Sequence, residues 1–223
     1  QAKEFIEMNS EYTDIIKIGF GTSSISPNVE KKIELYQNAG FKVYLGGTLF
    51  ESFIIRGMYK EYKDLLRKWN LKMCEVSDGI IEINHEEKCN YISDLSEEFL
   101  VVSEVGSKDE NKDLPTDLWI ELMQKELEAG SWKVIAEARE GGNVGVFGKE
   151  GKVKSDLIDQ IIKNVPSENI LWEAPIKQQQ VWFIKLLGAN VNLGNISHNE
   201  IIPLETLRIG LRGDTFFDYI NSK

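Results

Sequence analysis

The stretch MCEVSDG, residues 73–79, places a glutamate near the end of a short apolar run. Three later stretches repeat this pattern, and they read LVVSEVG (100–106), KVIAEAR (133–139) and ILWEAP (170–175). Their acids lie 29, 33 and 36 residues apart, and the four are Glu75, Glu104, Glu137 and Glu173. Each interval accommodates one strand and the crossover helix that parallel strands require. The repeat therefore predicts successive parallel strands with an acid at the same end of each.

The same alternation extends along the chain in both directions. Three more strand-like stretches read IIKIGFG (15–21), FKVYLGG (41–47) and ANVNLGNI (189–196). A helical segment follows every strand, the longest from about Thr48 to Asn70, and another helical segment precedes the first strand. Regular alternation is typical of a (β/α)8 barrel or of a doubly wound sheet. The loops after the strands are longer and richer in glycine and charge, as in barrels, whose active sites use those loops.

We expect one barrel domain over residues 1–223. The leading helix needs a strand before it, so the first barrel strand is expected upstream of Gln1 or absent from this protein. A chain of 223 residues with 42% hydrophobic residues suits one domain, slightly short for a barrel of about 250 residues.

Composition also narrows the range of partners. The net charge is −10 and there is no basic stripe, which argues against a nucleic-acid partner. No apolar run is long enough to span a bilayer, and no secretory signal is visible. Cys74 and Cys89 are expected to be free thiols, which indicates a cytoplasmic protein. The sequence leaves open whether the chain forms a homo-oligomer.

The four repeated acids indicate a shared polar site. An ionised carboxylate within an apolar strand is unfavourable unless it is paired or binds a cation. Carboxylates suit Mg²⁺, which prefers oxygen ligands, whereas His85, His198 and the two cysteines are too few and scattered for zinc. We therefore predict that Mg²⁺ binds among these acids. The alternative is that they form structural ion pairs inside the barrel.

Cations at strand ends, in loops and near the last helix predict an anionic ligand on this acidic protein. They are Lys17, Lys108, Arg139, Lys177, Arg208 and Arg212. Asn195 follows the last strand, where barrel enzymes often bind phosphate. Gly46-Gly47-Thr48 opens a helix, so its main-chain N–H groups could hold an anion, although a tight turn explains the glycines equally well.

Several motifs together resemble the phosphosulfolactate synthase family, from about residue 12 to 217. The most specific are GGTLFE (46–51) and LRGDT (211–215). The others are KIGFGTS (17–23), EVSDG (75–79), SEVGSK (103–108), EARE (137–140), EAPIKQQQ (173–180) and VNLGN (191–195). Two features depart from the family pattern. The family's first strand is missing, and neutral Asn143 and Val144 stand where charged residues are expected.

The resemblance implies a (β/α)8 barrel and a Mg²⁺-dependent carbon–sulfur lyase. Members add sulfite to phosphoenolpyruvate and form (2R)-2-phospho-3-sulfolactate, which leads to coenzyme M in archaea and to sulfolactate in some bacteria. Plant heat-stress proteins of unclear activity also belong to the family. A non-catalytic barrel of that type therefore remains an alternative. So does a barrel enzyme acting on another phosphorylated small acid.

This chemistry suggests a role for each candidate residue. Mg²⁺ held by the four glutamates would stabilise charge that develops when sulfite attacks C3. Lys108 would protonate C2 as the general acid, with Lys17 as the second candidate. The residues expected to hold phosphate and sulfite are Arg139, Lys177, Asn195, Arg208 and Arg212.

Overall fold

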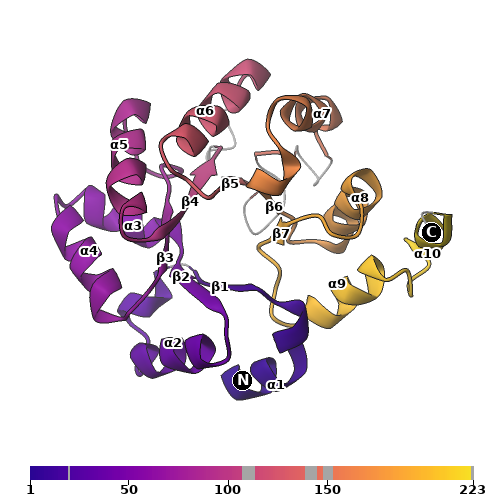
Figure 1. The fold of residues 1–223 in the computed structure, drawn as a ribbon, viewed down its shortest axis with the longest axis horizontal. Helices are drawn as coiled ribbons and strands as arrows, with labels where there is room; N and C mark the ends of the chain where they lie inside the picture. The colour runs from indigo at the N-terminus through magenta and orange to yellow at the C-terminus, as the bar shows by residue number, and fades with distance from the viewer. Residues whose placement is uncertain (20, 107–113, 139–144, 148–152, 222–223) are drawn as a thin grey trace.

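A computed structural model of the chain has parallel strands at its centre and helices around them (Figure 1). The structure describes residues 1–19, 21–106, 114–138, 145–147 and 153–221. The strands are β1 (Ile15–Ile18), β2 (Lys42–Leu45), β3 (Met73–Val76), β4 (Leu100–Val105), β5 (Lys133–Ala136), β6 (Ile170–Glu173) and β7 (Leu193–Gly194). The α-helices are α1 (Ala2–Asn9), α2 (Val29–Asn38), α3 (Gly47–Ile54), α4 (Tyr59–Lys68), α5 (His85–Ser96), α6 (Thr116–Glu128), α7 (Ser155–Asn164), α8 (Lys177–Leu187), α9 (Ile201–Arg208) and α10 (Phe216–Asn221).

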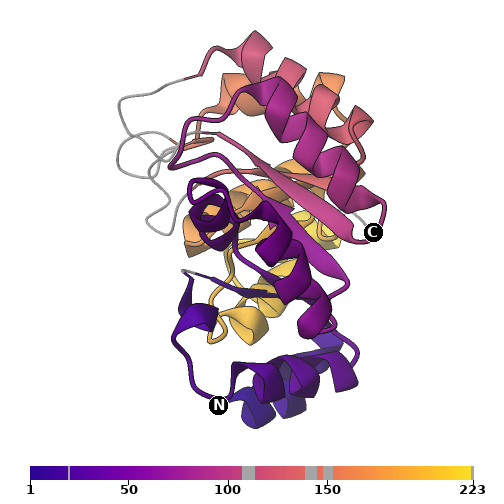
Figure 2. The same ribbon diagram turned by 90° about the vertical axis from the view of Figure 1, so that its left-hand side faces the viewer.

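The strands form two parallel ladders, β1-β2 and β3-β4-β5-β6-β7. β2 also packs beside β3, so the two ladders lie next to each other around the centre. Figure 2 shows the strands from the side, with helices above and below them. Because each crossover helix returns along the outside, all strands point the same way, and their C-terminal ends meet at one end of the molecule. The α/β barrel class predicted from the sequence is confirmed.

Side-chain alternation divides the core into an inner and an outer layer. Cys74 and Val76 of β3 point outward and pack beneath the helices, whereas Met73 points inward. The inner layer also contains Tyr44, Val102 and Ile135. Complete burial of an aliphatic side chain stabilises the fold by about 1.5–3 kcal/mol. The outer layer is much the larger, so most of this stabilisation comes from helix–strand packing.

The long helix predicted from Thr48 to Asn70 is wrong, because α3 ends at Ile54 and α4 begins at Tyr59. Gly57 has a φ of 67°, which a helix cannot continue through. The N–H of Met58 bonds to the carbonyl of Phe53, at 2.9 Å, and closes the helix end in the manner of a Schellman motif. The turn redirects the chain, so that α4 packs against the outside of the barrel.

The last predicted strand is also shorter than expected. The strand predicted at 189–196 is reduced to Leu193–Gly194, because Asn195 adopts a φ of 58° and Arg208 binds the carbonyls before the strand. The helix after this strand, α9, ends at Arg208, and α10 follows it. No helix in the described ranges has both the length and the apolar character needed to cross a membrane. Cys74 and Cys89 have free thiols, as predicted.

Candidate active site

The inward-facing positions at the C-terminal strand ends carry polar side chains instead of apolar ones. These are Lys17 of β1, Tyr44 of β2, Glu75 of β3, Glu104 of β4, Glu137 after β5, and Glu173 of β6. The four glutamates are only 1–2% exposed, and Lys17 is 22% exposed. The structure therefore brings the four acids that the sequence singled out, and one of its lysines, to the same end of the barrel.

Lys17 and Glu173 form the central ion pair of this site. The Lys17 Nζ lies 3.0 Å from Glu173 Oε1, while Glu173 Oε2 accepts a hydrogen bond from the N–H of Ala138 at 3.1 Å. Burial alone would lower the pKa of Lys17, but the nearby Glu173, Glu75 and other acidic groups raise it well above its usual value. Lys17 therefore carries a positive charge at neutral pH. It offers a fixed cation for a small anion rather than a readily released proton.

Tyr44 stands beside Lys17 in the β1-β2 ladder, because the two residues are register partners. Burial raises the pKa of the Tyr44 phenol well above its usual value, and the neighbouring carboxylates raise it further, although Lys17 opposes them. The phenol thus keeps its proton and remains a hydrogen-bond donor at the barrel mouth. Sequence reasoning missed Tyr44, although its inward register with Lys17 could have identified it.

The glycine pair before α3 holds an internal carboxylate. The N–H of Gly47 donates to Glu75 Oε1 at 2.6 Å, so Glu75 occupies the helix N-terminus that was proposed for an external anion. A Cβ atom on Gly47 would lie 2.4 Å from that oxygen and 2.2 Å from Ser77 Oγ. Only glycine allows β3 and α3 to approach this closely.

Substitution of Gly47 by alanine is expected to destabilise the protein by about 1–3 kcal/mol, the usual cost of overpacking a filled site. Thermal or urea unfolding measures this change. Gly213→Ala is the matched control, because a Cβ atom there meets nothing within 4 Å. Equal stability of the two variants would show that the contact between Gly47 and Glu75 relaxes freely.

Glu51 is a second buried acid that sequence reasoning missed. It lies in α3 at 1% exposure and accepts hydrogen bonds from Ser77 Oγ at 2.6 Å and from the N–H groups of Ile80 and Ile81 at 2.8 and 3.0 Å. These bonds hold the loop that follows β3 at the barrel mouth. A single acid within the apolar helix stretch LFESFI was the available signal.

The predicted anion-binding cations do not all reach this end of the barrel. Arg208 is the clear correction, since its guanidinium binds the carbonyls of Ala189 and Val191, the latter at 3.0 Å. Those carbonyls precede β7, so Arg208 lies at the opposite end of the strands. Because α9 runs back towards that end, a residue in its last turn cannot face the glutamates.

The other residues predicted to bind anions or donate a proton lie at separate positions in the chain. Lys177 begins α8 after β6, and its ammonium pairs with Asp214 at 2.6 Å on the protein surface. Arg212 lies in the segment after α9, where its charge helps to lower the pKa of Asp214. Asn195 directly follows β7. Lys108 and Arg139 lie outside the described residues.

The predicted metal site can be tested by the chemistry of its donors. Within the described ranges, no group of three or more His, Cys, Asp or Glu side chains could hold a metal ion. Mg²⁺ is usually bound by one or two carboxylates, completed by water and substrate phosphate oxygens. Buried carboxylates on neighbouring strands fit that mode of binding. Glu104 and Glu137 are such a pair, because their strands are adjacent in the sheet.

A parallel barrel with charged residues at its C-terminal end is the architecture of barrel enzymes. Solved structures agree on the fold. One 3-hexulose-6-phosphate synthase matches with a TM-score of 0.51 and 14% identity, over 86% of this chain and 83% of that one. The enzyme from Salmonella typhimurium matches with a TM-score of 0.53 and 18% identity, over 92% of each chain. The fold and the site define a parallel α/β barrel with buried charged residues at the C-terminal ends of its strands.

The family is shown by the sequence comparisons. The model of the (2R)-phospho-3-sulfolactate synthase (ComA) family matches residues 1–214. The phosphosulfolactate synthase of Methanocaldococcus jannaschii is 43% identical over 96% of this chain and 88% of that protein. The Bacillus subtilis phosphosulfolactate synthase is 39% identical, over 96% and 86%. The chain belongs to the phosphosulfolactate synthase family.

A more distant relative is Protein HEAT-STRESS-ASSOCIATED 32 of Arabidopsis thaliana. It is 23% identical over 92% of this chain and 79% of that protein.

Proposed function

We propose that this protein is a lyase that adds sulfite to phosphoenolpyruvate and forms (2R)-2-phospho-3-sulfolactate. The observation that carries the proposal is the buried Lys17–Glu173 pair among three further glutamates at the barrel mouth, in a chain of this family. Two anionic reactants need a fixed cation to approach one another. The free thiols are consistent with action in the reducing cytoplasm.

The reaction forms one carbon–sulfur bond and adds one proton. The sulfur lone pair of sulfite attacks C3 of phosphoenolpyruvate, the double-bond electrons move toward C2 and the carboxylate, and C2 then takes a proton. Lys17 is held charged beside Glu173 and would stabilise the negative charge that develops. Lys108, four residues after Glu104, is our proposed proton donor. Arg139 and Lys177 are our proposed phosphate and sulfite ligands.

Glu104 and Glu137 would hold Mg²⁺, with Glu75 and Glu173 beside them. When bound, the ion supplies a Lewis acid for the substrate carboxylate. Glu75 already accepts a hydrogen bond from Gly47, and Glu173 already pairs with Lys17. We therefore assign those two acids mainly to holding the site in shape.

Substitution of Glu104 or Glu137 by glutamine is expected to raise the Mg²⁺ concentration needed for half-maximal activity about 10-fold or more, because each amide removes a charged oxygen ligand. Mg²⁺ titration of the initial rate measures the change. Glu121→Gln is the control, since this exposed glutamate of α6 pairs with Lys125 on the surface. An unchanged Mg²⁺ requirement in both active-site variants would remove these two residues from the metal site.

The proposed function is tested by incubating the purified protein with phosphoenolpyruvate, sulfite and Mg²⁺. Loss of the phosphoenolpyruvate signal and appearance of a new phosphate ester in ³¹P NMR, both dependent on sulfite, are the expected results. Consumption without sulfite would indicate another reaction of a phosphorylated acid. The absence of any turnover would favour the alternative of a non-catalytic barrel protein.

A further inference from the structure

Lys88, in α5, is buried outside the barrel mouth at 1% exposure. Its ammonium lies 2.7 Å from Asp78 Oδ1 and 2.7 Å from Glu126 Oε1. It also donates a hydrogen bond to the main-chain carbonyl of Glu104 at 2.6 Å. An ammonium group has three donors, so these three acceptors match its full capacity.

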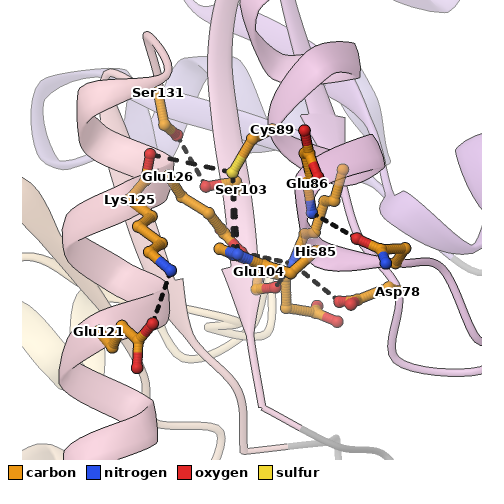
Figure 3. Close-up of polar contacts among 12 residues, drawn as sticks. Asp78, His85, Glu86, Cys89, Ser103, Glu104, Glu121, Lys125, Glu126 and Ser131 are labelled. Carbon is orange, nitrogen blue, oxygen red and sulfur yellow. Dashed lines mark hydrogen bonds and ion pairs between the residues drawn. The ribbon is translucent and has the colours of Figure 1, made fainter.

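The partners of Lys88 come from three separate elements. Asp78 belongs to the loop after β3, Glu104 to β4, and Glu126 to α6; Figure 3 shows Asp78 and Glu126 on either side of β4. Glu126 is completely buried, and His85 Nε2 lies 3.4 Å from its Oε1. The His85 side chain is 23% exposed.

The ion pairs of Lys88 with Asp78 and Glu126 place charged groups in the protein interior, where they lose their hydration. Burial lowers the pKa of Lys88, but Glu126 and Asp78 raise it above its usual value, so the lysine remains charged. Buried ion pairs rarely stabilise more than apolar side chains of equal volume, because both charges lose their hydration. Stability alone therefore explains the geometry poorly, and the bond to the Glu104 carbonyl needs its own explanation.

The hydrogen bond from Lys88 is made to the main-chain carbonyl of Glu104, one of the acids at the barrel mouth. Glu104 directs its carboxylate into the barrel and its carbonyl outward to Lys88, at the end of β4. A cavity lined by Val105, Gly106 and Lys88 lies beside this strand end. The N–H of Glu137 donates to the carbonyl of Val105 at 3.1 Å, and Lys88 adds a side-chain contact at the carbonyl of Glu104, one residue earlier.

We propose that Lys88 is a positioning residue, which fixes the main chain at Glu104 from outside the barrel and thereby aims the Glu104 carboxylate at the reaction site. The proposal rests on the proposed function, because that function gives Glu104 its role. Asp78 and Glu126 serve as counterions that keep the Lys88 ammonium in place. Glu51 also binds the loop after β3, which contains Asp78, by accepting hydrogen bonds from the N–H groups of Ile80 and Ile81.

The test separates positioning from stability. Lys88→Met alone leaves Glu126 buried without its ammonium partner, so a lower unfolding midpoint is expected. Lys88→Met/Glu126→Met replaces the pair by apolar side chains of similar volume, and its unfolding midpoint should return close to that of the wild type. Lys63→Met is the control, because it removes an ion pair of 2.6 Å with Asp94 away from β4.

Two readouts are measured on the double variant. The Mg²⁺ requirement for turnover should rise about 10-fold, the usual size of effect for residues that orient metal ligands. Independently of activity, ¹³C NMR with δ-labelled glutamate should show the Glu104 resonance shifted or broadened. The Glu104 resonance is assigned as the one that disappears from the spectrum of the Glu104→Gln variant. Lys63→Met should change neither readout.

A double variant with wild-type stability, an unchanged Glu104 resonance and an unchanged Mg²⁺ requirement would overturn the proposal. If instead the proposed function is wrong, the wild-type protein itself will not consume phosphoenolpyruvate with sulfite. In that case the Glu104 resonance alone decides whether Lys88 positions this residue.

Discussion

Substitution of Lys17 by methionine is expected to lower kcat for the sulfite-dependent consumption of phosphoenolpyruvate by about 10²–10³-fold, the usual effect of removing one preorganised electrostatic group. Lys17 is held 3.0 Å from Glu173 among buried carboxylates, and its raised pKa keeps it charged. Without it, the two anionic reactants meet additional repulsion from the buried glutamates at the barrel mouth. Steady-state kinetics at saturating Mg²⁺ measures the loss.

Two further variants separate catalysis from folding. Lys17→Met/Glu173→Gln removes both charges, so it should recover stability but not activity. Lys42→Met is the control, because this exposed lysine begins the neighbouring strand β2 at the opposite end of the barrel. Near-normal kcat in Lys17→Met would show that the pair with Glu173 is structural.

Substitution of Lys108 by alanine should lower the rate by about 10²–10⁴-fold, the range for a general acid. A proton donor works best when its pKa lies near the working pH, and the pKa of Lys17 is raised well above that range. The raised pKa assigns Lys17 to the role of fixed charge, so Lys108 stays our proposed donor. Single-turnover kinetics should show that proton transfer is slowed, while phosphoenolpyruvate still binds through the proposed ligands Arg139 and Lys177.

Lys108→Arg should not restore the rate, because a guanidinium scarcely releases a proton near neutral pH. The arginine variant keeps the positive charge, so it separates proton donation from electrostatic attraction. Turnover close to that of the wild type in Lys108→Ala would remove Lys108 from the role of general acid.

The sequence by itself determined the order of the strands and which of their residues face inward. Strand alternation has a period of two, so the spacing within a stretch such as MCEVSDG places Met73 and Glu75 on one face and Cys74 on the other. Because all strands are parallel, equivalent acids had to meet at one end. This local reasoning was sufficient to place the four glutamates and Lys17 together.

Only the tertiary structure decided which residues meet across elements. Arg208 was predicted at the mouth, but the direction of α9 carries it to the opposite end of the strands. Lys88 and Glu126 gave little signal in the sequence, because a buried charge on a helix looks like a surface charge until its partners are known. Periodicity is a local property of the chain, whereas ion pairs between helices and loops depend on how those elements pack.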